Sequence, residues 1–361
     1  MPRILHAAAL SCLLLQAAAA GTSAQAQSAK KTVSFGLPTA TINASYCMFT
    51  AAKELGYFDE EGLSVSINNL AGSVALAQTL LAGRVDVGAV TPEPTFQLLA
   101  KGNDLVIVYN LIRSPTGGVI AALPDTKQKS FADFRGKKLG AQSLAAGDIP
   151  FTNSIFKGIG IDPKTEITYL AVGVGAQALQ ALKSGFVDGL VLWDSAYAQI
   201  ESLGAELKYF QGPNIENLFS TQLVAMRKFV DQSPDVVRGV GRAVAKATLF
   251  AQENPAACVR LLWKSVPGAR SSGVTEDQQL KNDVRILEQR LRLMIRPAVA
   301  QHGFGYIDAA DVEAWDKYAF DNGITEKRVP NLSNAFTNNF LAHYNNFDKK
   351  AVAEQARAWK P

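Results

Sequence analysis

The chain has 361 residues, with 36 Lys and Arg against 32 Asp and Glu, so its formal net charge is +4. The two signs are scattered evenly and no basic stripe interleaves with aromatic residues, which excludes nucleic acid as an expected partner. The length suggests two domains. Only three cysteines are present, so packed cores rather than disulfides must carry the fold.

The N-terminal segment is typical of a secretory signal. One positive charge in residues 1–3 precedes an almost wholly apolar run over residues 7–20, and Ala-Gln-Ala at 24–26 offers a cleavage site. The apolar run is shorter than the ~20 residues that a membrane-spanning helix needs. We therefore predict residues 1–26 to be a signal peptide cleaved near Ala26, and the mature chain to be periplasmic.

Cleavage would remove Cys12 and leave Cys47 and Cys258. Residues 9–11, before Cys12, make a poor lipoprotein box, so no lipid anchor is expected. The spacing of the two remaining cysteines does not show whether they pair.

After the signal, strand patterns alternate with helix patterns. The expected order is a strand over 31–38, a helix over 43–55, a strand over 63–67, a helix over 74–81 and a strand over 85–90. Strands that alternate with helices of about ten residues indicate a mostly parallel sheet covered on both faces.

This pattern then repeats. The segment 77–87 resembles the segment 179–189, and each contains Gly-x-Val-Asp, with the two copies 102 positions apart. A period of about 100 residues in two copies predicts twin domains rather than a solenoid. The aspartates of the motif, Asp86 and Asp188, stand at strand starts, opposite the expected cleft, so we expect them to have a structural role.

The repeat leads to an α/β fold of two doubly wound lobes joined by a two-segment hinge. Residues 110–118 read as the first crossing between the lobes, and 219–226 as the return. The predicted lobe 1 is discontinuous, and the predicted lobe 2 lies within it. Lobe 1 comprises residues 27–117 and 218–361, with extra C-terminal helices packed on it, and lobe 2 comprises 118–217.

Several blocks resemble one family of periplasmic binding proteins. Leu-Gly-Tyr-Phe-Asp-Glu-Glu-Gly-Leu-Ser-Val at 55–65 is similar to its Gly-Tyr-Phe…Glu-Gly-Leu-x-Val signature, and further blocks lie at 80–86, 190–198 and 335–341. Members serve importers of alkanesulfonates, taurine, nitrate and thiamine-pyrimidine precursors. The common Trp-Asp-Pro is Trp-Asp-Ser at 193–195. The resemblance implies a type II periplasmic binding-protein fold, a ligand between the lobes and an ABC permease in the inner membrane as partner.

Candidate ligand contacts follow from the fold. In open α/β sheets, ligands bind beyond the carboxyl ends of the strands, where the N-termini of helices point. The loops at those ends contain Thr39, Asn43, Tyr46, Gly72, Ser73, Thr91 and Glu93 in lobe 1, Ser114 and Thr116 at the crossing, and Ser143, Asp148, Trp193 and Asp194 in lobe 2. Each Ser or Thr could equally be a helix cap or form a turn.

Trp193 follows a strand and opens toward the expected cleft. We expect it to give a ligand an apolar platform whose indole N–H fixes orientation, with Tyr46 as the opposing wall. The alternative is that both are ordinary core aromatics.

Carboxylates dominate the expected cleft. Glu93, Asp148 and Asp194 lie in its loops, with Arg113 the only guanidinium expected nearby. A desolvated anion needs paired donors, so this balance favours a ligand with an amine, amidine or aminopyrimidine group. The alternatives are an organic anion such as a sulfonate or carboxylate, with the acidic residues acting as caps and surface charges.

Two motifs raise the question of an enzyme. Residues 172–178 match Gly-x-Gly-x-x-Ala, but they follow the second strand of their lobe, so close packing is expected and no cofactor. The family that the chain resembles also includes pyrimidine synthases that consume their own histidine. Those enzymes carry Cys-Cys-Cys-Phe-Cys at a position like residues 46–49, where this chain has a single cysteine. The mature histidines, His302 and His343, lie in the helical tail, and no spacing suggests a metal site.

The predicted function is therefore non-enzymatic. We expect a monomeric substrate-binding component of an ABC importer that encloses a small organic solute. A cofactor-dependent exported enzyme and a solute sensor for a membrane receptor are the alternatives.

Overall fold

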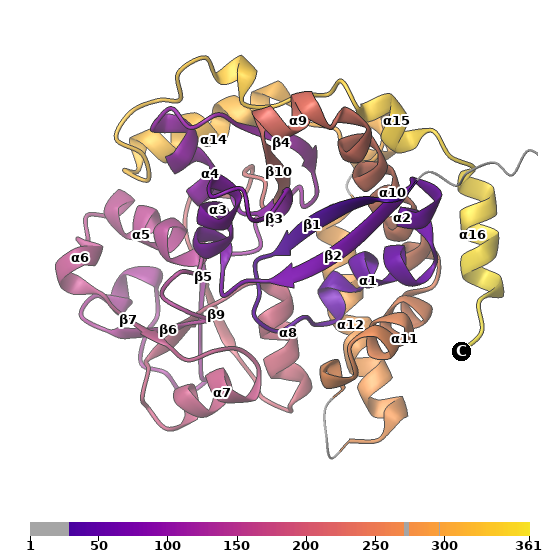
Figure 1. Cartoon of the computed structure of the whole chain (residues 1–361). Helices are drawn as coiled ribbons and strands as arrows, with labels where there is room; N and C mark the ends of the chain where they lie inside the picture. The colour runs from indigo at the N-terminus through magenta and orange to yellow at the C-terminus, as the bar shows by residue number, and fades with distance from the viewer. Residues whose placement is uncertain (1–28, 271–273, 296) are drawn as a thin grey trace, which may run out of the picture.

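A computed structural model describes residues 29–270, 274–295 and 297–361. The predicted signal peptide lies outside these residues. Two five-stranded sheets form the frame of the molecule (Figure 1). We call the first sheet with the helices packed on it lobe 1, and the second sheet with its helices lobe 2. The limits predicted from the sequence at 117/118 and 217/218 stay a prediction.

The sheet of lobe 1 has the strand order β2-β1-β3-β10-β4. β1 pairs in parallel with β2 and β3, whereas β10 runs antiparallel between β3 and β4. The strands are β1 (Lys31–Leu37), β2 (Leu63–Asn69), β3 (Val87–Val90), β4 (Leu105–Asn110) and β10 (Gln222–Met226). The return segment thus becomes a strand of the first sheet.

The sheet of lobe 2 has the equivalent order, β7-β6-β8-β5-β9. β6 pairs in parallel with β7 and β8, and β5 runs antiparallel between β8 and β9. The strands are β5 (Val119–Ala122), β6 (Lys138–Ala141), β7 (Thr168–Ala171), β8 (Gly189–Val191) and β9 (Lys208–Gln211). The internal repeat seen in the sequence is therefore a repeat of sheet topology.

The repeated aspartates stabilise the starts of strands, as predicted. The Asp86 carboxylate accepts a hydrogen bond from the Ser34 backbone N–H at 2.8 Å, and Asp188 accepts one from the Lys138 N–H at 2.9 Å. Both bonds join a connecting loop to the first parallel strand of its own lobe.

Two irregular segments connect the lobes. Residues 111–118 contain no strand. The N–H groups of Leu111 and Ile112 donate to the Thr221 carbonyl of the return segment, at 3.2 and 2.9 Å, and the Arg113 N–H donates to the Leu293 carbonyl at 3.0 Å. The Ser220 N–H donates to the Ile112 carbonyl at 2.8 Å, and the hydroxyls of Thr116 and Ser220 lie 2.8 Å apart. The two segments of the hinge are thus bonded to each other.

Helices cover both faces of each sheet. Those of lobe 1 are the 3-10 turn η1 (Ala44–Tyr46), α1 (Cys47–Glu54), α2 (Tyr57–Glu60), α3 (Ser73–Leu81) and α4 (Pro92–Ala100). Those of lobe 2 are η2 (Phe131–Phe134), α5 (Asp148–Gly158), α6 (Pro163–Glu166), α7 (Ala176–Lys183) and α8 (Asp194–Ser202).

The C-terminal part is helical. Its elements are α9 (Arg227–Gln232), α10 (Pro234–Glu253), α11 (Pro255–Ser265), η3 (Pro267–Ala269), α12 (Glu276–Met294), α13 (Pro297–His302), α14 (Ala309–Asp321), η4 (Leu332–Asn334), α15 (Leu341–Asn345) and α16 (Lys349–Ala358). Proline opens α10 and α11, and the Thr275 hydroxyl caps α12 by accepting from the Gln278 N–H, as the sequence predicts.

The tail packs on lobe 1, as expected, and two of its helices also reach lobe 2. α10 and α11 pack against α1, whereas α12 lies between η1 and α8. On α14, the Trp315 ring lies 5.5 Å from the Phe151 ring of α5. The lobes are therefore in contact through the tail as well as through the hinge.

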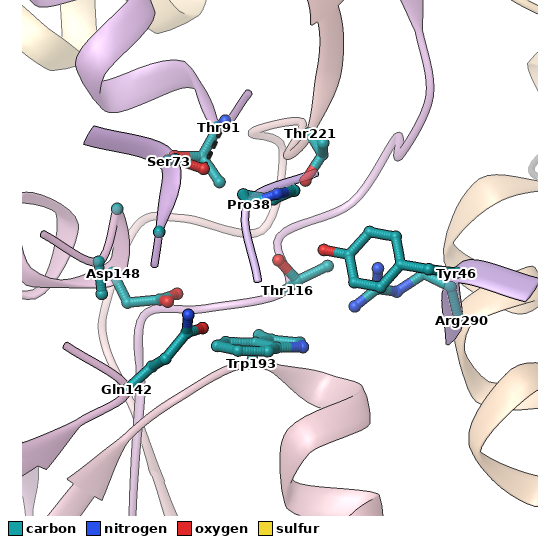
Figure 2. A pocket seen from close by; sticks show the side chains of 13 residues that line it. Pro38, Tyr46, Ser73, Thr91, Thr116, Gln142, Asp148, Trp193, Thr221 and Arg290 are labelled. Atoms are coloured by element: carbon teal, nitrogen blue, oxygen red, sulfur yellow. Dashed lines mark hydrogen bonds between the residues drawn. The ribbon is translucent and has the colours of Figure 1, made fainter. Parts of the chain in front are cut away.

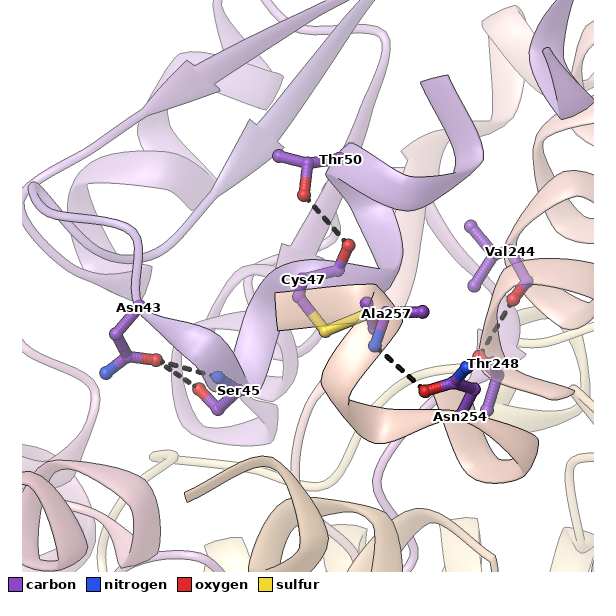
Figure 3. The surroundings of a disulfide bond; sticks show 9 residues. Asn43, Ser45, Cys47, Thr50, Val244, Thr248, Asn254 and Ala257 are labelled. Atoms are coloured by element: carbon purple, nitrogen blue, oxygen red, sulfur yellow. Dashed lines mark hydrogen bonds between the residues drawn. A yellow bond between two sulfur atoms is a disulfide. The ribbon is translucent and has the colours of Figure 1, made fainter. Parts of the chain in front are cut away.

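A disulfide between Cys47 and Cys258 joins α1 to α11 across 211 positions of sequence (Figure 3). This answers the question that the spacing left open. A bond that closes so long a loop restricts the unfolded chain and stabilises the fold by roughly 2–4 kcal/mol. In the described ranges, no helix is long and apolar enough to cross a membrane.

Candidate functional site

A small cavity of about 30 Å³ lies between the two lobes (Figure 2). Its walls come from the carboxyl ends of strands in both sheets, as the fold predicts. The lining residues are Pro38, Tyr46, Gly72, Ser73, Thr91, Thr116, Gln142, Ala146, Gly147, Asp148, Trp193, Thr221 and Arg290.

The rims of the lobes touch, so this is a closed arrangement. The Val74 N–H of lobe 1 donates to the Ala145 carbonyl of lobe 2 at 3.1 Å, and the Ser143 hydroxyl donates to the Ala71 carbonyl. Gly72 has φ +124°, and a Cβ there would lie 2.4 Å from the Ala145 oxygen. Glycine is needed at this position because the opposite rim leaves no room for a side chain.

Trp193 forms the floor of the cavity, with its ring lying between the two ends (Figure 2). Its side chain is largely buried, and the indole N–H donates to the Ser195 hydroxyl at 2.9 Å. The expected use of that N–H to orient a ligand does not fit this geometry, because the N–H already has a partner. The face of the ring remains available as a platform.

Arg290, from α12, closes one end of the cavity together with Tyr46 (Figure 2). Its guanidinium donates to both carboxylate oxygens of Asp194, at 3.0 and 2.5 Å, and lies 5.4 Å from the centre of the Tyr46 ring. The side chains of Arg290 and Asp194 are 2% and 8% exposed, so the pair is buried. Asp194 is committed to this ion pair and does not line the cavity.

No local pattern singles out Arg290, which stands 96 positions from its partner in a long charged helix. The expectation that Arg113 is the nearby guanidinium is wrong. Arg113 donates to the Tyr306 carbonyl of the tail, and burial lowers its pKa.

Asp148 lies at the opposite end of the cavity, beside Gln142 (Figure 2). It begins α5 and, among the described residues, forms no ion pair. Burial raises the pKa of Asp148 to about 7, and the charge of Asp194 adds to this effect. The side-chain nitrogen of Gln142 is buried and has no hydrogen-bond partner in the described structure. This end therefore offers both an acceptor and a free donor.

The candidate residues divide into two groups. Those that line the cavity are Tyr46, Gly72, Ser73, Thr91, Thr116, Asp148 and Trp193. The others, Thr39, Asn43, Glu93, Ser114, Ser143 and Asp194, lie near it but do not line it. Sequence reasoning missed Gln142, Thr221 and Arg290, which carry side-chain polar groups into the cavity.

The residues outside the cavity have local roles. The Thr39 hydroxyl donates to the Thr41 carbonyl at 2.8 Å, and the Asn43 side chain caps η1 by accepting from the Ser45 N–H at 3.0 Å. Glu93 is buried in the first turn of α4, and burial raises its pKa to about 8. Ser114 lines a separate groove between the hinge and α12.

Residues 43–258 match the family described as NMT1/THI5 like. The chain belongs to this family. The fold of this member has two lobes that enclose a cavity. Gly173 and Gly175 of the apparent dinucleotide motif do not line that cavity.

Curated relatives of this family member include both a binding protein and an enzyme. It is 25% identical over 285 residues to a formylaminopyrimidine-binding protein of Halalkalibacterium halodurans, covering 76% of this chain and 80% of the relative. It is 24% identical over 225 residues to a 4-amino-5-hydroxymethyl-2-methylpyrimidine phosphate synthase of Legionella pneumophila, covering 61% and 69%.

Among solved structures, the alkanesulfonate-binding protein of Xanthomonas axonopodis pv. citri, bound to MOPS, matches with a TM-score of 0.64 at 16% identity. The match covers 85% of this chain and 98% of that protein. At this identity the likeness shows the periplasmic binding-protein fold alone.

Proposed function

We propose that this protein is the periplasmic substrate-binding component of an ABC importer. It is exported with a signal segment cleaved near Ala26, and it captures a small organic solute as a monomer and presents it to a permease. The observation that carries this proposal is the enclosed cavity, which is built from the strand ends of both lobes and floored by Trp193. A ligand there contacts both lobes only when they are closed, so binding favours closure.

The polar groups of the cavity favour an aminopyrimidine or a related planar amine. Among the described residues, Arg290 is the one cationic side chain that lines it, and its Nε and Nη2 already donate to the two oxygens of Asp194. An organic anion would therefore meet a guanidinium whose charge is already balanced by a carboxylate, and it would lie close to Asp148.

A planar heterocycle with an amine fits the end of the cavity that Asp148 and Gln142 form. With its ring on Trp193, its amine can donate to the Asp148 carboxylate, and a ring nitrogen can accept from the unpartnered Gln142 amide. The formylaminopyrimidine-binding relative supports this ligand class.

A catalytic role, as in the relatives named synthases, lacks the groups it would need. Among the described residues, the cavity is lined by neither histidine nor cysteine, and Cys47 is held in a disulfide. No described cluster of His, Cys, Asp or Glu is arranged to hold a metal ion. We therefore propose capture without chemistry, so a ligand released by denaturation should have its original mass.

Calorimetric titration of the mature protein tests the ligand class. Formylaminopyrimidine should bind in the micromolar range, about −8 kcal/mol, whereas MOPS and short alkanesulfonates should give no binding heat. Native mass spectrometry of protein purified without refolding would identify any ligand carried from the periplasm. Tight binding of a sulfonate with no binding of the pyrimidine would overturn the assignment.

A further inference from the structure

A chain of hydrogen bonds runs from the floor of the cavity into the other lobe. The Trp193 indole N–H donates to the Ser195 hydroxyl at 2.9 Å, Ser195 donates to the Ser45 hydroxyl at 3.0 Å, and Ser45 donates to the Asn43 side-chain oxygen at 2.6 Å. The Asn43–Ser45 bond is visible beside the disulfide in Figure 3. Ser195 and Ser45 are 0% and 1% exposed, so water does not compete for these bonds.

Ser195 is the junction of this chain. It belongs to α8 of lobe 2, whereas Ser45 belongs to η1 of lobe 1. Its oxygen also accepts a hydrogen bond from the Arg290 guanidinium at 3.0 Å. One hydroxyl therefore accepts from Trp193 and Arg290 and donates to Ser45, which uses its single proton and both lone pairs.

Separation of the lobes would break this junction. Ser45 lies on lobe 1, and Arg290 lies on α12, which packs against η1 and α11 on one side and against α8 on the other. When α8 moves away from η1, Ser195 loses its bond to Ser45 and its hydroxyl is free to rotate. The indole keeps its acceptor, but that acceptor is no longer held in place from the other lobe.

We propose that Ser195 is a positioning residue that couples closure of the lobes to the orientation of the Trp193 ring, with Ser45 as its partner across the cleft. Proline, the residue of the common Trp-Asp-Pro pattern, has no hydroxyl and could not make these bonds. The coupling rests on the proposed capture function, but it acts in the ligand-free protein. The coupling fixes the orientation of the Trp193 ring when the lobes close, and it favours the closed form in the absence of ligand.

Fluorine NMR of protein labelled with 5-fluorotryptophan tests this without any ligand. The chain has four tryptophans, and Trp193→Phe identifies the resonance of Trp193. Ser45 is linked to the indole through the Ser195 hydroxyl, so Ser45→Ala is the decisive variant. It should shift or broaden the Trp193 resonance and leave those of Trp263, Trp315 and Trp359 in place. Ser195→Ala should change the same resonance.

The matched control is Ser154→Ala. Ser154 is also a buried serine of lobe 2, and its hydroxyl lies 3.0 Å from the Tyr318 hydroxyl on α14. Tyr318 stacks edge-on with Trp315. The control should therefore move the Trp315 resonance and leave Trp193 unchanged.

Small-angle scattering of the same samples measures the ratio of closed to open protein. Ser45→Ala and Ser195→Ala should each lower the ratio of closed to open protein about fivefold, the scale of one lost hydrogen bond. The double variant should lower it no further than Ser195→Ala alone, because both substitutions break one chain. An unchanged Trp193 resonance in Ser45→Ala, or additive effects in the double variant, would overturn the coupling. Neither result depends on which solute the protein binds.

Discussion

Asp148 and Asp194 each begin a helix of lobe 2 and each face the space between the lobes, but their surroundings differ. Asp194 is paired through both oxygens with Arg290, so it helps to hold the lobes together. Asp148 has no charged partner among the described residues, and burial raises its pKa to about 7. Asp194 thus stabilises the contact between the lobes, whereas Asp148 remains available to bind a ligand.

The largest expected effect is a change in stability when each of the two aspartates is replaced by asparagine. Asp194→Asn should lower the free energy of unfolding by about 3–5 kcal/mol, because it leaves the buried Arg290 charge unpaired. Asp148→Asn should not lower it at pH 7 and should raise it, since the aspartate has no cation to lose and its raised pKa means that its charge disfavours the folded state. Urea unfolding of both variants measures the difference. Equal destabilisation would mean that the two ends are not distinct.

Ligand affinity should show the opposite ranking. Asp148→Asn should weaken binding of formylaminopyrimidine by about 1.5–3 kcal/mol, the scale of a hydrogen bond to a charged group. Arg292→Ala, on the exposed side of α12, is the matched control for surface charge and should bind as the unmodified protein does. Full affinity in Asp148→Asn, measured by calorimetry, would remove Asp148 from the site.

Trp193 lies between the two ends and should contribute to binding alone. Trp193→Ala should weaken the same ligand by about 1–3 kcal/mol, the value of one buried aromatic contact. Ligand addition to the unmodified protein should also change tryptophan emission, and Trp193→Phe should remove that change while retaining most of the affinity. An emission change that survives in Trp193→Phe would place the ligand elsewhere.

The smallest effect is a dependence of stability on pH. The pKa of Asp148 is raised from its unfolded value to about 7, so between these values the folded state binds more protons than the unfolded state. Stability from this group is complete at low pH and is lost as the pH rises through 7. Between pH 6 and 8 the loss should be about 1 kcal/mol.

The control for this dependence is Asp148→Asn, which should flatten the curve but not abolish it. Glu93, with a pKa of about 8, contributes in the same direction at higher pH. Thermal unfolding at several pH values gives the comparison. Identical curves for the variant and the unmodified protein would show that Asp148 does not titrate in this range.

The contrast between the ends also shows what the sequence could predict. Strand and helix alternation, the Gly-x-Val-Asp repeat and the cap at Thr275 are local patterns, and each predicted its element. The sheet rule placed Trp193 and Asp148 at the cavity because it depends only on where strands end.

Partner choice was not predictable in the same way. Arg290 reaches Asp194 only because α12 packs between η1 and α8, and no local pattern encodes that packing. Counting charges in loops therefore assigned Asp194 to a ligand, when a helix far along the chain supplies its cation. The same applies to Ser195, because no local pattern shows that Ser45 lies opposite it.

The order of strands also sets an order of assembly. The sheet of lobe 2 uses only residues 119–211, whereas β10 must enter between β3 and β4 before the sheet of lobe 1 is complete. A chain that emerges from its N-terminus therefore holds an unfinished sheet while the later lobe becomes able to form. The Cys47–Cys258 bond adds a further delay, because one of its thiols waits for a helix 211 positions downstream. Lobe 1, whose first strands are synthesised first, is therefore the lobe that completes its sheet last.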